Sequence, residues 1–276
     1  MQTLPVDTLL PQLRQTLAHC NNAVLQAPPG AGKTTRVPLA LLDADWLGGR
    51  KILLLEPRRL AARAAARFMA RSLGEPVGAT VGYRVRLDSR VGLGTRIEVV
   101  TEGVLTRLLQ ADPALEQVGL VVFDEFHERS LQADIGLALC LDSQSALRED
   151  LRILVMSATL DGAAVARLLG DAPLLTSAGR SYPVAMHYRP PATPRTPAGH
   201  LSYESVVQVV HEALRVEAGS VLVFLPGTGE IRRLETALQA AGLAADVRVV
   251  PLYGQLDART QDAAIQPPPA GIRKVV

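Results

Sequence analysis

A short apolar segment that runs into a glycine-rich loop constrains the fold of this chain more than any other feature. Residues 23–26 (AVLQ) precede residues 27–35 (APPGAGKTT). Gly30 and Gly32 permit backbone conformations that a Cβ would block, so that successive N–H groups can face an anion. Lys33 adds a compact positive charge, and the hydroxyl of Thr34 suits a magnesium ion. This order predicts a strand, a phosphate-binding loop and a helix whose positive end meets the anion.

The candidate loop departs from the usual pattern at one position. The pattern G-x-x-x-x-G-K-[ST] requires glycine where this chain has Ala27. A plainer interpretation is a Gly/Pro turn that joins a strand to a helix, but the lysine, the paired threonines and the upstream strand favour the phosphate loop. The candidate nucleotide-binding residues are Pro29, Gly30, Ala31, Gly32, Lys33, Thr34 and Thr35.

A second apolar segment, residues 120–123, ends in two acids. Asp124 can hold a metal through water, and Glu125 can orient and deprotonate an attacking water. Adjacent side chains point in different directions, so each acid can take one role. An acidic pair after a strand is also common as a solvated strand end, and the phosphate loop upstream favours catalysis. We therefore expect Lys33, Asp124 and Glu125 to be catalytic, and Thr34, Asp124 and Glu125 to serve the metal.

Six motifs occur in one order along nearly the whole chain. They are the phosphate loop, EPRRLAAR at 56–63, TEGVLTR at 101–107, DEFHERS at 124–130, SATL at 157–160 and VLVFLPGTGEI at 221–231. In this order they resemble superfamily 2 helicases of the DEAH-box type. DEFHERSLQAD at 124–134 is similar to the bacterial HrpB-type branch, in which phenylalanine replaces the alanine of the family name. The resemblance implies two RecA-like domains of the P-loop NTPase fold, with ATP and Mg²⁺ as cofactors.

The resemblance also implies roles that the residues alone do not indicate. His127, Ser157 and Thr159 would relay the state of the nucleotide to a nucleic acid groove; the two hydroxyls have a plain alternative as caps of the next helix. The backbone of the nucleic acid would be held by Arg58, Arg59, Thr101, Glu102 and Gly103, and in the second domain by Gly227 and Thr228. Such contacts are tolerant of base sequence. The preference for single-stranded RNA over DNA rests on the resemblance only.

Four arginines recur at four-residue spacing on the helix expected after residue 58. They are Arg59, Arg63, Arg67 and Arg71. At 3.6 residues per turn this row drifts around the helix, so that only the first one or two can share a strand of nucleic acid. For Arg63, Arg67 and Arg71 we expect a solvated helix face.

Apolar segments alternate with amphipathic ones, which predicts a doubly wound α/β fold with a parallel sheet flanked by helices. We expect strands at 22–26, 51–56, 96–100, 118–123 and 152–157, and helices near 6–19, 33–42, 58–72, 102–110, 131–147 and 161–169. A first RecA-like domain would span residues 1–176, and the proline-rich residues 177–199 would form a connection. In a second, incomplete RecA-like domain at 200–276 we expect helices at 201–216 and 229–241, and strands at 221–225, 248–252 and 272–276.

Composition narrows the class of protein. The net charge of +2 means that a nucleic acid surface must come from local placement of arginines, and the aromatic content of 4% argues against a module built on base stacking. Two cysteines are too few for a disulfide framework, and no apolar run of 18 residues occurs. We expect a cytoplasmic monomer that does not enter the membrane.

The sequence contains no QxxGRxGR-like stretch, the segment that in the resembled family supplies arginines to the γ-phosphate. Such an arginine accounts for about 10³ to 10⁵ in rate. We therefore expect this chain to be an N-terminal fragment that binds nucleotide and turns it over slowly. Two other classes stay open, a regulatory ATPase that needs no nucleic acid and a nucleotide-binding scaffold; the intact Lys33, Asp124 and Glu125 argue against the scaffold.

Overall fold

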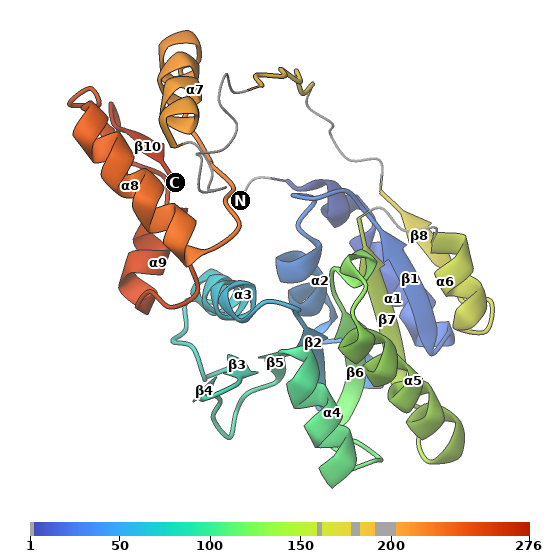
Figure 1. Cartoon of the computed structure of the whole chain (residues 1–276). Coiled ribbons are helices and arrows are strands. Elements are labelled where there is room, and N and C mark those ends of the chain that lie inside the picture. Colours follow the sequence, from blue (N-terminus) through green and yellow to red (C-terminus); the bar gives the residue numbers. More distant parts are fainter. Residues whose placement is uncertain (1–2, 159–161, 178–182, 191–202) are drawn as a thin grey trace. The chain divides into compact units, whose positions relative to one another are not determined.

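The computed structural model describes residues 3–158, 162–177, 183–190 and 203–276. The chain divides into two compact units, residues 1–182 and residues 183–276, which Figure 1 colours from blue to yellow and from yellow to red.

The first unit is built on a sheet of eight strands in the order β4-β3-β5-β2-β6-β7-β1-β8. All neighbouring strands are parallel except β3 and β4. The five predicted strands are confirmed to within one residue at each end: β1 Asn22–Gln26, β2 Lys51–Leu55, β5 Ile97–Val100, β6 Val118–Phe123 and β7 Arg152–Ser157. Three further strands complete the two edges: β3 Val81–Val85, β4 Asp88–Arg90 and β8 Leu174–Thr176.

Helices cover both faces of this sheet, as the alternating sequence predicts (Figure 1). The helices are α1 Leu10–His19, α2 Lys33–Leu41, α3 Arg59–Ser72, α4 Glu102–Ala111, α5 Leu131–Ala146 and α6 Gly162–Leu168, with 3₁₀ turns at Pro5–Thr8, Asp45–Leu47 and Phe126–Glu128. Alternate residues of each central strand face opposite layers, so that Ile52 and Leu54 pack with α1, α2 and α3 while Leu53 and Leu55 pack with α4, α5 and α6. The inner strands are buried on both faces, which explains their continuous apolar sequences.

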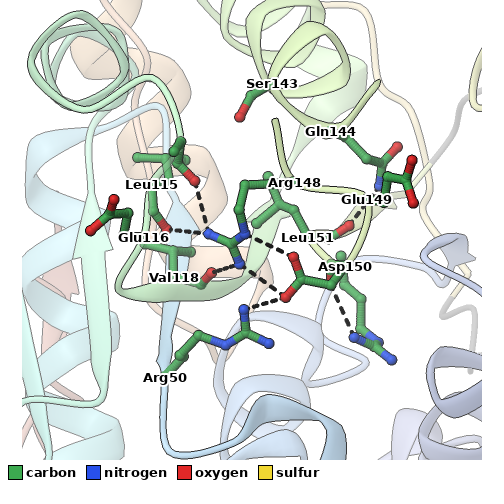
Figure 2. Close-up of polar contacts among 12 residues, drawn as sticks. Arg50, Leu115, Glu116, Val118, Ser143, Gln144, Arg148, Glu149, Asp150 and Leu151 are labelled. Carbon is green, nitrogen blue, oxygen red and sulfur yellow. Dashed lines mark hydrogen bonds and ion pairs between the residues drawn. The ribbon is translucent and has the colours of Figure 1, made fainter. Parts of the chain in front are cut away.

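Arg148 connects several segments at the amino-terminal edge of the sheet through hydrogen bonds (Figure 2). The guanidinium of Arg148 donates hydrogen bonds to the backbone carbonyls of Ala114, Leu115 and Val118 at 2.8, 2.9 and 3.1 Å. It also pairs with the carboxylate of Asp150 at 2.8 Å, and Arg50 binds the same carboxylate from the start of β2. This network joins the segments that lead into β2, β6 and β7, at the opposite edge from the predicted motifs.

The second unit contains α7 Tyr203–Val216, α8 Thr228–Ala241, β9 Val247–Val249, α9 Ala258–Ile265 and β10 Arg273–Val275. Strands β9 and β10 pair in parallel, and Val207, Val210, Leu234, Leu238 and Val275 form the buried centre of this unit. Helices α7 and α8 agree with the sequence prediction within the described residues, whereas α9 was not predicted. The predicted strand at 248–252 is shorter and ends at Val249.

The prediction of a buried strand at 221–225 is wrong. Only Val221 forms a bridge, to Val275 of β10, and Phe224 is 86% exposed. Val221, Val223 and Leu225 pack against the core of the unit, whereas the alternate residues Leu222 and Phe224 face away from it. A continuous apolar run predicts a strand that is buried on both faces, but other residues of the unit cover this segment on one face only.

The predicted connection at 177–199 falls largely outside the described residues. The division between the two units lies after residue 182, six residues beyond the predicted end of the first domain. The described residues of the connection, Ser177 and residues 183–190, contain neither helix nor strand.

Candidate active site

The three central motifs meet because their strands are neighbours. Strand β7 lies between β6 and β1 in the sheet, and all three run parallel. The phosphate loop follows β1, the acidic pair follows β6, and Ser157 is the last residue of β7. Carboxyl ends of parallel strands share one edge, which is where such folds bind ligands. The structure therefore brings together residues that the sequence separates by more than one hundred positions.

The loop between β1 and α2 has the backbone that a phosphate cradle needs. Gly30 and Gly32 have φ of 75° and 91°, in the left-handed region that favours glycine. A Cβ on Gly32 would also lie 2.6 Å from Cδ1 of Leu4. Helix α2 begins directly afterwards at Lys33, and the N–H groups of a first helical turn have no acceptor within their own helix. These donors are the ones that an anion would use.

Lys33 lies buried inside the loop. Its Nζ donates to the carbonyl oxygens of Ala27 at 2.6 Å and Pro28 at 3.3 Å. An ammonium group has three donors, so the loop carbonyls take two of them in this state. Ala27, at the position where the pattern requires glycine, is buried and its N–H bonds to the carbonyl of Ser157 at 3.0 Å. The departure from the pattern is accommodated without loss of the loop.

Thr34 and Asp124 join the phosphate loop to the acidic pair. The hydroxyl of Thr34 donates a hydrogen bond to Oδ2 of Asp124, and Oδ1 of Asp124 accepts the N–H of Glu125 at 2.8 Å. Asp124 is buried, and this burial raises its pKa to about 6, against the lowering effect of the Thr34 hydrogen bond.

A hydroxyl and a carboxylate are oxygen ligands of the kind that Mg²⁺ prefers. Thr34 and Asp124 are the two residues of this pair of motifs that would hold such an ion.

Glu125 and Asp124 point in different directions, as predicted. Glu125 has a left-handed backbone with φ of 49°, and its Oε2 lies 3.3 Å from Nε2 of His127. Nδ1 of His127 accepts the N–H of Ala158 at 3.3 Å. A neutral imidazole with its proton on Nε2 satisfies both contacts. His127 thus links the acidic pair after β6 to the SAT segment after β7.

Phe126 anchors this turn, a contribution that the sequence prediction missed. Its ring is buried and meets Phe123 edge-on at 6.2 Å, and the guanidinium of Arg129 lies 5.9 Å from its centroid. Glu125 and Arg129 on either side both have positive φ, which is strained for residues other than glycine. A large apolar residue inside an otherwise polar motif was the available signal.

Ser157 is buried at the end of β7, opposite Gln26 of β1. Thr159 lies outside the described residues.

The candidate nucleic acid residues of the first unit lie farther along the same edge. Arg58 and Arg59 follow β2, while Thr101, Glu102 and Gly103 follow the neighbouring strand β5. The side chain of Arg58 is 70% exposed and pairs with Glu128 at 2.8 Å. Thr101 is the N-cap residue of α4, so the free N–H groups of that helix also open at this edge.

Gly227 and Thr228 are at the start of α8 in the second unit, with Gly227 as the N-cap residue. On α3 the predicted solvated face is wrong for Arg63, which is largely buried and pairs with Asp88 at 3.4 Å. The unpredicted strand β4 supplies this partner.

Glu56 is the other residue that sequence reasoning missed. It directly follows β2 and is buried, and its Oε2 has no hydrogen-bond partner in the described part of the chain. Burial, followed by the charges of Asp124, Glu125 and Glu128, raises the pKa of Glu56 to about 8. The signal was an acid at the end of an apolar strand, the same signal that identified Asp124.

A phosphate loop and an acidic pair at the carboxyl edge of one helix-flanked parallel sheet define the class of P-loop nucleotide-binding proteins. Residues 10–168 match the family model of the DEAD/DEAH box helicase, more than half of the chain. The chain belongs to the DEAD/DEAH box helicase family.

The chain is similar to curated helicases over its whole length. It is 51% identical to the ATP-dependent RNA helicase HrpB of Escherichia coli (strain K12), over 100% of this chain and 33% of that protein. It is 31% identical to the ATP-dependent RNA helicase HrpA of Borreliella burgdorferi, over 99% of this chain and 33% of that protein. The chain therefore spans about a third of the length of these relatives.

The solved structures agree with this assignment. The crystal structure of the Escherichia coli DEAH/RHA helicase HrpB matches with a TM-score of 0.89 and 51% identity, over 99% of this chain and 34% of that chain. The predicted resemblance to DEAH-box helicases of the HrpB type and the RecA-like fold are confirmed. In the described part of the chain, no helix has the length and apolar character needed to cross a bilayer.

Proposed function

We propose that the protein is an ATP-dependent RNA helicase that couples ATP hydrolysis to translocation along, or unwinding of, a nucleic acid strand. The observation that carries the proposal is the contact between Thr34 and Asp124, which unites the phosphate loop and the acidic pair in one site. The relatives with which the chain shares its whole length are named as ATP-dependent RNA helicases.

Each residue of the site has a distinct task in this proposal. The amides of residues 29–35 and the ammonium of Lys33 bind the β- and γ-phosphates, and Lys33 exchanges its two loop carbonyls for phosphate oxygens. Thr34 and Asp124 would hold Mg²⁺, and the ion would neutralise charge on the phosphate oxygens. Glu125 accepts a proton from the attacking water as that water approaches the γ-phosphate in line.

His127 is the proposed link between chemistry and movement. It touches the carboxylate of Glu125 on one side and the N–H of Ala158 on the other. A change in the position of Glu125 during hydrolysis therefore displaces the segment of Ser157 and Thr159. We propose that this displacement alters the grip on the nucleic acid.

The proposed nucleic acid contacts are to phosphates. Arg58, Arg59 and the helix starts at Thr101–Gly103 offer donors at one edge of the first unit, and Gly227 and Thr228 offer a second helix start in the other unit. Two separate grips allow a strand to be moved when the units open and close. The preference for RNA is supported by the names of the relatives. Function as a monomer in the cytoplasm is part of the same proposal.

A titration of ATPase rate tests the proposal. We expect single-stranded RNA to stimulate hydrolysis by the intact protein more strongly than DNA of the same length and sequence at one salt concentration. A steady rate that neither strand alters would instead indicate a regulatory ATPase. Absence of nucleotide binding would overturn the proposed function, and binding without any hydrolysis would indicate a scaffold.

A polypeptide of these 276 residues alone is proposed to bind nucleotide and to hydrolyse it slowly. The sequence lacks a QxxGRxGR-like stretch, and arginines of that kind supply about 10³ to 10⁵ in rate. A nucleic-acid-stimulated rate equal to that of a full-length relative would contradict this part of the proposal.

A further inference from the structure

Glu56 is held beside Asp124 by the backbone of the sheet. Its N–H bonds to the carbonyl of Val100 in β5 at 2.9 Å, and the carbonyl of Leu55 accepts the N–H of Asp124 at 3.1 Å. Strands β2 and β6 pair Leu55 with Phe123, so the next residues along each strand are Glu56 and Asp124. The two acids are thus neighbours at the carboxyl edge of the sheet.

Both acids face the layer that contains the phosphate loop. Leu54 and Val122 belong to the core between the sheet and helices α1, α2 and α3. Side chains alternate between faces along a strand, so the residues two positions further on, Glu56 and Asp124, point toward the same layer. Helix α2 of this layer begins with Lys33 and Thr34.

The carboxyl group of Glu56 differs from that of Glu98, another buried acid of the same sheet, because Glu98 is paired with basic side chains. Glu56 is 5% exposed, and its Oε2 is unpartnered among the described residues. Glu98 of β5 is 3% exposed, but it binds Arg84 at 2.7 Å and Lys51 at 3.8 Å. A buried carboxyl without a partner is costly, and native proteins retain such a group where a ligand or water satisfies it.

The side chains around Glu56 are mostly negative, so a cation would be favoured there. The carboxylates of Asp124, Glu125 and Glu128 act on it electrostatically, and the opposing charge is that of Arg58, which already binds Glu128. A cation held at Thr34 and Asp124 would lie beside Glu56, because Glu56 and Asp124 follow the paired residues Leu55 and Phe123 at this edge of the sheet.

We propose that Glu56 is a positioning residue of the magnesium site, whose Oε2 accepts a hydrogen bond from a water bound to the nucleotide-associated ion. This inference rests on the proposed nucleotide site. Mg²⁺ keeps several of its waters in proteins, and groups that bind those waters orient the ion and raise its affinity. Glu56 is then needed for metal-dependent binding of nucleotide and not for contact with the nucleotide itself.

The test measures nucleotide affinity of the intact protein with and without the metal. A fluorescent ADP is titrated in EDTA and at rising MgCl₂ for the wild type, Glu56→Gln and Glu56→Ala, with Glu98→Gln as the matched buried-acid control. We expect Glu56→Gln to raise the half-saturating Mg²⁺ concentration about tenfold, and Glu56→Ala to raise it further. Affinity in EDTA should stay that of the wild type, and Glu98→Gln should keep the wild-type metal dependence.

Thermal unfolding supplies a second readout that does not depend on catalysis. Glu56→Gln keeps the size and shape of the side chain, so we expect an unfolding temperature near that of the wild type without metal. The rise in unfolding temperature on addition of ADP with Mg²⁺ should be smaller than in the wild type. If Glu56→Gln has the wild-type metal dependence, or loses affinity equally in EDTA, the inference is wrong while the nucleotide site stands. If the wild type binds no ADP under any condition, the proposed function and the inference both fail.

Discussion

The hydroxyl of Thr34 donates a hydrogen bond to the carboxylate of Asp124, although the two residues are 90 positions apart in the chain. The contact joins the phosphate loop directly to the acidic pair. The contact also fixes which oxygen of Asp124 faces α2, since the other accepts the N–H of Glu125. Preorganisation of this kind lowers the cost of binding an ion at the site.

Replacement of Thr34 by alanine tests this contact. Thr34→Ala removes a proposed metal ligand and leaves the buried Asp124 without its side-chain donor, so we expect the affinity for ADP in the presence of Mg²⁺ to fall at least about tenfold. Thr236→Ala, on an exposed face of α8, is the control. Equilibrium titration with fluorescent ADP gives the measurement. Wild-type affinity in Thr34→Ala at all metal concentrations would show that the hydroxyl serves no metal.

Glu125→Gln separates binding from chemistry. The amide keeps the size of the side chain but accepts no proton, so we expect unchanged ATP affinity and a hydrolysis rate lower by about 10² to 10⁴. Nucleotide titration and steady-state ATPase assays measure the two quantities on one preparation. Parallel loss of affinity and rate would place Glu125 in the binding of nucleotide instead of in water activation.

Phe126→Ala probes the anchor of the strained turn. Loss of a buried ring typically costs about 3 to 5 kcal/mol, and the left-handed backbone of Glu125 next to it would lose its support. We expect a free energy of unfolding lower by about 3 kcal/mol in urea and a reduced ATPase rate. Phe126→Leu, which keeps most of the apolar volume, should lose less of both. Equal stability of the alanine variant and the wild type would refute the anchoring role.

Asp150 gives the fold a sensitivity to acid at the edge opposite the site. Its hydrogen bonds with Arg148 and then Arg50 hold the pKa of its carboxyl well below the usual range. A carboxyl with a lowered pKa in the folded state stabilises the protein above its unfolded pKa of about 4, and the contribution is lost as the pH falls through the folded value. The half-exposed position of Asp150 keeps this contribution modest.

Thermal unfolding between pH 7 and pH 3 of the wild type and Asp150→Asn checks the sign. We expect Asp150→Asn to be less stable at pH 7 and the difference to shrink on acidification. A constant difference over the whole range would mean that the ion pairs with Arg148 and Arg50 contribute nothing to the pH dependence.

The central part of the fold followed from the sequence because its signals are local. Strand β6, for example, is a continuous apolar run that Asp124 follows directly. The burial of the strand on both faces matches its apolar composition. Once β1, β6 and β7 are placed in one parallel sheet, their loops must meet, which is why the positions of Lys33, Thr34 and Asp124 could be predicted.

The edges of the sheet and parts of the site carry no such signal. Strand β4 has the sequence Asp-Ser-Arg and exists only because it pairs with β3, and β8 is three residues long. Glu56 follows an apolar strand as Asp124 does, but an acid at that position is also common as a solvated strand end. Its burial beside Asp124 is visible only in the structure. In the second unit, the run at 221–225 has the composition of an inner strand, but its neighbours cover one face only.

The occupied ammonium of Lys33 has a consequence for ligand selection. The carbonyls of Ala27 and Pro28 accept two of its three donors. A ligand oxygen can take the third donor directly, and a ligand that takes more than one must replace a carbonyl of the loop.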